Sequence, residues 1–140
     1  MGVQMRFNVF GLGLLFSISL FSAPSLAECV IPPSLNQCKT CHAVEPGKPS
    51  RATGPSLVGV PGQAAMHSAD FKGYSEAMKA AQGKGLTWTD DNLLNYLADP
   101  KAFLASFNGQ PLKNAMMFQI KDEAKRKAAI EGLKAISACQ

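Results

Sequence analysis

Residues 38–42 read Cys38-Lys39-Thr40-Cys41-His42. On one helical turn, two thiols three positions apart reach the two vinyl groups along one edge of a haem, and the following imidazole reaches the iron. The pattern therefore indicates covalent c-type haem attachment through Cys38 and Cys41, with His42 as the proximal iron ligand. A zinc site or a thioredoxin-like redox pair would use similar residues. Zinc needs a second pair of ligands, and the redox pair normally lies in a βαβ unit, so both alternatives lack support elsewhere in the sequence.

The composition of the chain is that of one small folded domain. It has 140 residues, of which 46% are hydrophobic and 17% are charged. The apolar content excludes a disordered chain, and the length excludes a multidomain enzyme because domains commonly span about 100–200 residues. The formal net charge is +4, but the 14 Lys and Arg residues are dispersed along the sequence with few aromatic residues among them. This dispersion argues against nucleic-acid binding.

The first 27 residues have the pattern of a secretory signal peptide. Only Arg6 is charged, an apolar run covers 7–21, and small residues stand at the processing positions before the cleavage point. The run is shorter than the roughly 20 residues of a bilayer-spanning helix, so we expect cleavage after Ala27 and no stable membrane insertion. An uncleaved anchor and a lipidated Cys29 remain as alternatives. We expect residues 28–140 to form one domain in the periplasm, an oxidising compartment.

Helical patterns separated by long loops dominate the mature chain, and no segment alternates as a strand would. Asp99-Pro100 stops one helical pattern, and Ala129, Leu133 and Ile136 recur along another at spacings of four and three. The loop after the haem motif is long, which a haem permits because loop residues can pack on the macrocycle. The fold class is therefore all-α. The four predicted helices are Ser75–Gln82, Thr89–Ala98, Lys101–Ser106 and Asp122–Ala138.

Further motifs follow residues 38–42 in a fixed order. They are Thr53-Gly54-Pro55, Tyr74-Ser75, Leu86-Thr87-Trp88-Thr89, Tyr96-Leu97 with Asp99-Pro100-Lys101, and Met116-Met117-Phe118. With these motifs the chain resembles a class I cytochrome c, of the soluble bacterial type that carries an insertion before the distal methionine. The resemblance covers nearly the whole mature chain. It implies a class I cytochrome c fold, with three to five helices and long loops wrapped around one covalently bound haem c.

The sixth iron ligand comes from a small set of donors in the mature chain: His67, Met66, Met78, Met116 and Met117. The resemblance favours Met116, because Met116 and Phe118 have the M-x-F relation that the family shows around its distal ligand. Met117 is the alternative. We expect Met66 to be a loop residue and His67 to be a solvated surface residue. Met78 lies in a predicted helix, and we expect its side chain to pack in the protein core.

The resemblance also implies roles for the other residues around the haem. The carbonyl of Pro55 accepts a hydrogen bond from the ring of His42, and Trp88 and Tyr74 donate to a haem propionate. An apolar wall that excludes water consists of Leu57, Tyr96, Leu97 and Phe118.

The chain departs from the family pattern at three places. Gln63 stands where many relatives have an arginine near the inner propionate, so it brings no charge. Pro32-Pro33 leaves room only for a short N-terminal helix. Its partner position in the last helix, normally aromatic, is Gly132, which costs about 1 kcal/mol of helix propensity. We therefore expect the contact between the first and last helices to be thin on both sides.

Ligation by histidine and methionine leaves no iron position for a substrate, so the resemblance implies an electron carrier and not an enzyme. A haem enzyme or ligand-binding protein with an open sixth position, such as a small peroxidase, is the alternative. The expected partners are redox proteins: a quinol-oxidising complex or periplasmic dehydrogenase as donor, and a terminal oxidase, reductase or photosynthetic reaction centre as acceptor. We expect a monomer.

Two further expectations concern the lysines and the remaining cysteines. The resemblance places Lys39, Lys101, Lys113 and Lys121 near the exposed haem edge, as a basic rim for docking. Cys29 and Cys139 are the thiols left after haem attachment, and each lies at one end of the mature chain. Because class I cytochromes cross their first and last helices, we expect these two cysteines to form a disulfide. Two free thiols or a lipidated Cys29 are the alternatives.

Overall fold

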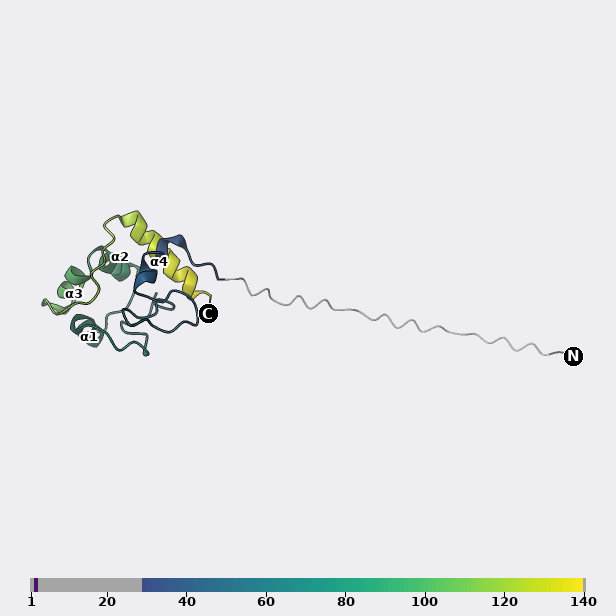
Figure 1. Cartoon of the computed structure of the whole chain (residues 1–140), viewed down its shortest axis with the longest axis horizontal. Coiled ribbons are helices and arrows are strands. Elements are labelled where there is room, and N and C mark those ends of the chain that lie inside the picture. Colours follow the sequence, from purple (N-terminus) through teal and green to yellow (C-terminus); the bar gives the residue numbers. More distant parts are fainter. Residues whose placement is uncertain (1, 3–28, 140) are drawn as a thin grey trace.

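The computed structural model describes Gly2 and residues 29–139. The predicted signal peptide, residues 1–27, lies outside the described residues except for Gly2. The described part contains four α-helices, two short 3-10 helices and two isolated β-bridges, and Figure 1 shows the helices packed together with long loops between them. This arrangement confirms the all-α prediction. Among these residues no helix is both long and apolar enough to cross a membrane.

Each α-helix begins where the sequence supplies a capping side chain. Oxygens of Ser75, Thr89, Asp99 and Asp122 accept hydrogen bonds from backbone N–H groups of the first turns. These groups have no partner inside a helix, so the caps fix the starting points. The four predicted helices are confirmed, with ends that differ by one or two residues. They are α1 (Glu76–Gly83), α2 (Asp90–Ala98), α3 (Pro100–Asn108) and α4 (Glu123–Ser137).

The junction between α2 and α3 follows from Asp99 and Pro100. Asp99 ends α2 in an extended conformation and caps α3, and Pro100 occupies the first turn of α3, where no N–H donor is needed. Helix α3 extends beyond its predicted end because Gly109, with φ of +74°, terminates it. Asn108, which lies beyond the predicted helix end, is the last residue of α3 and is buried, and its Nδ2 donates to the carbonyl of Ala77 at 2.9 Å. This bond joins α3 to α1.

The N-terminal helix is reduced to η1 (Pro33–Leu35), as the two prolines predict. Its contact with α4 is close, however, which corrects the expectation of a thin contact. Leu35 is fully buried, and a Cβ atom built on Gly132 would lie 3.1 Å from Leu35 Cγ and 2.7 Å from Ser34 Oγ. The small residue therefore replaces the aromatic one by letting the backbone of α4 approach η1 directly.

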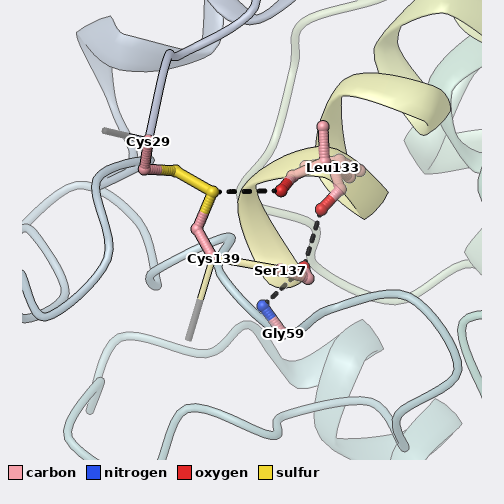
Figure 2. Close-up of a disulfide and its surroundings, with 6 residues drawn as sticks. Cys29, Gly59, Leu133, Ser137 and Cys139 are labelled. Carbon is pink, nitrogen blue, oxygen red and sulfur yellow. Dashed lines mark hydrogen bonds between the residues drawn. A yellow bond between two sulfur atoms is a disulfide. The ribbon is translucent and has the colours of Figure 1, made fainter. Parts of the chain in front are cut away.

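A disulfide between Cys29 and Cys139 joins the two ends of the described domain, as Figure 2 shows, and confirms the predicted pairing. The Cα atoms of the two cysteines are 5.9 Å apart. Next to the disulfide, Ser137 Oγ accepts a hydrogen bond from Gly59 N at 2.8 Å and donates one to the Leu133 carbonyl at 2.6 Å. The last turn of α4 is thus tied both to the N-terminal segment and to a long loop.

The helices enclose one apolar core. Helix α4 packs on α2 and η1, and α3 packs on α1 and α2. The apolar face predicted for α4 is buried, and so is Met78, as expected for a core residue. The largest side chains that are fully buried belong to Leu35, Val44, Leu86, Pro100, Leu104 and Ile136.

Candidate haem site

A cavity of about 670 Å³ opens beside the core, between the N-terminal segment, the long loops and helices α2 and α4. This volume lies within the usual range for small-molecule and cofactor sites. Its lining is mainly apolar. The cavity brings together all eleven residues predicted to bind the haem: Cys38, Cys41, His42, Pro55, Leu57, Tyr74, Trp88, Tyr96, Leu97, Met116 and Phe118.

The attachment motif forms a tight helical turn. The 3-10 helix η2 spans Cys38–Thr40, and the carbonyl of Cys38 accepts hydrogen bonds from Cys41 N at 3.1 Å and His42 N at 2.9 Å. Both thiols are free and line the cavity. Burial raises the pKa of the Cys38 thiol, whereas Cys41 is exposed at the cavity edge. The turn presents two thiols on one side of the chain and the imidazole directly after them.

The ring of His42 is held by a backbone acceptor. Nδ1 donates to the carbonyl of Pro55 at 2.8 Å, which is the hydrogen bond that the resemblance implies. Since a carbonyl oxygen only accepts, the proton resides on Nδ1 and the lone pair on Nε2 is left for a metal. Burial lowers the pKa of His42, and the Pro55 carbonyl partly opposes this shift, so the ring is kept in the neutral form that binds iron. Gly54 lies so close that a Cβ atom would be 2.7 Å from the ring.

Met116 reaches the cavity from the segment between α3 and α4, which has no regular secondary structure. Its side chain is half-buried and packs against the core. Asn114 Nδ2 donates to the Met116 carbonyl at 2.7 Å. The neighbouring Met117 also lines the cavity, but it is 72% exposed. Met116 is thus the more buried of the two methionines at the cavity.

The cavity wall agrees only in part with the expected set of water-excluding residues. Tyr96 and Leu97 are buried, Leu57 is half-buried, and Trp88 packs against Tyr96 with ring centroids 4.8 Å apart. Burial raises the pKa of the Tyr96 phenol, so it stays neutral. Phe118, by contrast, is 42% exposed and forms the rim of the cavity instead of a sealed wall.

Tyr74 has a second partner that the sequence does not indicate. Its hydroxyl donates to the carbonyl of Ser68 at 3.2 Å. In this structure the hydrogen that was expected to bind a haem propionate is therefore bound to a backbone carbonyl. The ring of Phe71 packs edge-on against Tyr74, with centroids 4.9 Å apart. These contacts hold the loop before α1 against the cavity.

His67 corrects the prediction of a solvated surface residue. It is half-buried and lines the cavity together with Met66, which has a left-handed backbone conformation with φ of +62°. His67 Nε2 lies 3.3 Å from the carbonyl oxygen of Val58 and 3.2 Å from Ser68 Oγ. No periodic signal marks such a position, because the direction of the side chain depends on a turn and on a contact with another loop.

The residues around the cavity fit a covalently bound haem. They supply two free thiols on one turn, an imidazole whose Nε2 is available, a half-buried thioether and an apolar lining. The described residues contain no group of three or more His, Cys, Asp or Glu side chains that could hold a bare metal ion. The fold and this set of side chains define a class of protein, the small helical proteins that attach haem through a Cys-x-x-Cys-His motif.

Comparisons with known proteins identify the family. The chain is 39% identical over 133 residues to cytochrome c2 of Cereibacter sphaeroides, covering 86% of this chain and 89% of that protein. It is 37% identical over 101 residues to cytochrome c2 of Rhodospirillum rubrum, covering 71% and 73%. No protein-family model matches the chain.

Solved structures give the same result. The crystal structure of cytochrome c2 from Rhodobacter sphaeroides superposes with a TM-score of 0.66 at 38% identity, covering 72% of this chain and 88% of the other. Cytochrome c2 from Rhodospirillum centenum gives 0.66 at 34% identity, covering 74% and 92%. The chain belongs to the class I cytochromes c, and the relatives described above are cytochromes c2. It carries one covalently bound haem c and is a monohaem electron-transfer protein.

Proposed function

We propose that this protein moves single electrons between redox proteins of the periplasm, and that His42 and Met116 would be the two side chains that bind its haem iron. The observation that carries the proposal is the arrangement of donors: one cavity contains the free thiols, the unused Nε2 of His42 and the half-buried thioether of Met116. When bound, the haem supplies a one-electron iron couple, and a thioether ligand raises its potential. With His42 and Met116 both bound to it, the iron would have no free position for a substrate.

The protein's own residues have three tasks in this proposal. The Pro55 carbonyl orients the His42 ring and makes it a more basic ligand. The buried pair Trp88 and Tyr96 keeps the inner part of the cavity apolar. The exposed rim at Met117 and Phe118 leaves one edge of the site open to partner proteins.

Replacing each methionine tests the assignment of the distal ligand. We expect Met116→Ala to remove the far-red absorption band of sulfur bound to ferric iron and to lower the reduction potential. Met117→Ala is the matched control and should leave both nearly unchanged, because Met117 is 72% exposed. The reverse pattern would assign Met117 as the ligand.

The same spectra separate an electron carrier from a haem enzyme. If the unmodified protein lacks the sulfur band and binds cyanide or carbon monoxide rapidly at neutral pH, its sixth position is open. That result would support a peroxidase-like or ligand-binding protein and contradict the proposed carrier. A protein with the band and slow ligand binding supports the carrier.

Export to the periplasm is supported by the Cys29–Cys139 disulfide, since such bonds form and persist in oxidising compartments. It also agrees with the signal-peptide pattern of residues 1–27. The intact mass of protein purified from its native cells gives the mature N-terminus. A chain that begins at Glu28 supports cleavage after Ala27, whereas a retained leader or an acylated Cys29 contradicts it.

A basic rim is proposed as the docking surface. Lys101, Lys113 and Lys121 are exposed and Lys39 is half-exposed. Among the described residues, the lysines found in ion pairs are Lys127 and Lys134, so the four rim lysines are available to a partner. Electron transfer to an acidic redox partner should slow as salt rises, because the screening length falls to about 8 Å at physiological ionic strength. A rate that is flat from low to high salt would exclude this surface.

A further inference from the structure

Two successive methionines line the cavity, and they differ in how they are placed. Met116 is half-buried and packs against the core, whereas Met117 is 72% exposed. We infer that Asn114 is a positioning residue that selects Met116 over Met117 as the iron ligand, because it holds the backbone carbonyl that lies between the two side chains. This inference rests on the proposed function, since it requires that a methionine binds the iron.

The chain that carries the two methionines is fixed at its ends by other parts of the molecule. Ala77 N donates to the Lys113 carbonyl at 3.1 Å, and Ile120 N donates to the Leu97 carbonyl at 2.8 Å. Between these points lies the methionine segment, residues 114–119, which has no regular secondary structure and no backbone–backbone hydrogen bond to any described residue. The two end contacts alone therefore do not determine which of two successive side chains turns inward.

Asn114 supplies a contact in the middle of the methionine segment. The residue is half-buried at the cavity, and its Nδ2 donates to the Met116 carbonyl at 2.7 Å. Asparagine readily forms such local bonds to the backbone. Here the bond fixes the direction of the peptide group that joins Met116 to Met117. Rotating that peptide group to turn the Met117 thioether inward would break the bond.

Packing on both sides of Met116 excludes a different route to the same exchange. Leu112 and Ile120 are, like Met116, partly buried and packed against the core. The chain therefore cannot slide by one residue without withdrawing these two side chains from their apolar contacts, which costs free energy. Exchange of Met116 for Met117 is thus a local rearrangement of residues 114–119. The Asn114 bond lies inside the part that must move.

Binding of imidazole to the ferric, haem-loaded protein measures how firmly a methionine holds the iron position. Imidazole must displace Met116, and this moves the Met116 carbonyl away from Asn114. One hydrogen bond that is present in one state only shifts an equilibrium about two- to tenfold, so we expect Asn114→Ala to raise the imidazole affinity by that factor. Asn114→Asp should raise it at least as much, because a carboxylate of the same shape has no N–H to donate. Unchanged affinity in both variants overturns the inference.

Asn92→Ala is the matched control. Asn92 Nδ2 donates to the Thr87 carbonyl at 2.7 Å, which is the same kind of bond at the same distance, in the first turn of α2 and outside the methionine segment. Its loss should lower the free energy of unfolding about as much as Asn114→Ala does and leave the imidazole affinity unchanged. An equal rise in affinity in both variants would indicate general loosening of the fold and overturns the inference.

A second set of variants separates selection from simple support. In Met116→Ala, imidazole binds without displacing a methionine, and the Asn114 bond keeps Met117 turned outward. Adding Asn114→Ala should let Met117 turn inward, so that part of the sulfur band returns and the imidazole affinity falls several-fold. The effect of Asn114→Ala on imidazole binding therefore changes sign between the two backgrounds. Adding Met117→Ala as well should abolish both changes. If Asn114→Ala raises the affinity or leaves it unchanged in the Met116→Ala background, Asn114 does not select between the methionines.

The same variants distinguish a failure of this inference from a failure of the proposed function. If Met116→Ala retains the sulfur band, Met116 is not the ligand, and both the proposed ligation and the selection fail. If Met116→Ala loses the band while Asn114→Ala leaves imidazole binding unchanged in both backgrounds, Met116 ligation stands and selection by Asn114 fails.

Discussion

The two sides of the cavity are held in different ways. On the His42 side, the ties are local: His42 bonds to Cys38 and Pro55, and Thr53 Oγ1 donates to the Cys41 carbonyl at 2.9 Å. Every one of these partners lies within 13 positions of the residue that it holds. The ligand and its supports thus belong to one short stretch of chain.

On the Met116 side, the supports come from elsewhere in the molecule. Ala77 N of α1 donates to the Lys113 carbonyl at 3.1 Å, and Ile120 N donates to the Leu97 carbonyl of α2 at 2.8 Å. These bonds hold the segment at two points, and Met116 lies between them. The His42 side is therefore ordered by its own sequence, whereas the Met116 side depends on α1 and α2 being in place. We expect the Met116 side to open first when the protein is destabilised.

Removing the disulfide has the largest expected effect and tests whether the His42 side is ordered by local contacts alone. The bond closes a separation of 110 residues. Chain entropy assigns about 4.7 kcal/mol to a loop of about 100 residues, but the attached haem already restrains the unfolded chain, so we expect Cys29→Ala with Cys139→Ala to cost about 3 kcal/mol. Denaturant unfolding of the haem-loaded protein measures this loss.

Reductant supplies the control for that experiment. With the haem iron kept reduced in every sample, the reductant should destabilise the unmodified protein by a similar amount and leave the double variant unchanged. Amide exchange at His42 should quicken only by the factor by which global unfolding becomes more frequent. The reason is that the acceptor of this amide, the Cys38 carbonyl, lies four positions away and does not depend on the disulfide. Equal stability of variant and unmodified protein would show that the disulfide is dispensable. If the His42 amide exchanges faster than global unfolding allows, the local hydrogen bonds are not sufficient to hold this side of the cavity.

The same contrast explains what the sequence could and could not predict. The attachment motif, the four helices and the break at Asp99-Pro100 are local patterns, and each was found where expected to within one or two residues. The disulfide followed from the count of cysteines and the crossing of the terminal helices. These features depend on neighbouring residues or on a family-wide topology. For that reason they can be recognised without coordinates.

The features that the sequence did not reveal depend on contacts between distant segments. The inward direction of His67 requires the Val58 carbonyl and the turn at Met66. The close packing at Gly132 requires η1 to lie on α4, and a glycine in a helix otherwise indicates only weak propensity. The exposure of Phe118 depends on the path of the segment between α3 and α4, which has no regular secondary structure, along the cavity edge. None of these has a periodic or motif signal.

Filling the space beside the His42 ring should break the more ordered side. In Gly54→Ala the new Cβ atom would lie 2.7 Å from His42 Nδ1 and Cε1 and 2.9 Å from the Cys41 carbonyl, so the ring or the backbone must shift. Overpacking of this kind costs about 2 kcal/mol. We expect that loss in denaturant unfolding, together with a changed ferric absorption spectrum.

Gly83→Ala is the matched control for that substitution. Gly83 ends α1, has nothing within 4 Å of a built Cβ atom and does not have a positive φ. Alanine there should be neutral or stabilise by up to about 1 kcal/mol. If Gly54→Ala is as stable as Gly83→Ala, the close approach to His42 has no energetic consequence, and the local ties on this side are weaker than the distances suggest.

The smallest expected effect concerns Arg126, which holds the Met116 segment at its end. Its Nη1 donates to the carbonyls of Ile120 and Lys121, both at 2.8 Å, just before α4 begins. Charge-assisted bonds of this kind contribute about 1.5–3 kcal/mol when buried, but Nε of Arg126 is buried without a partner among the described residues and offsets part of that gain. We therefore expect Arg126→Gln to cost about 1 kcal/mol.

The loss should be local. Amide exchange at Ile120 should quicken several-fold, while exchange at His42 should not change, because the Ile120 amide donates to Leu97 and the His42 amide donates to Cys38. The neighbouring Lys127→Gln is the control, since it removes only an exposed pair with Glu123, worth about 0.5 kcal/mol or less. Equal acceleration at His42 and Ile120 in Arg126→Gln would mean that both sides open together, which would contradict the separate anchoring of the two ligands.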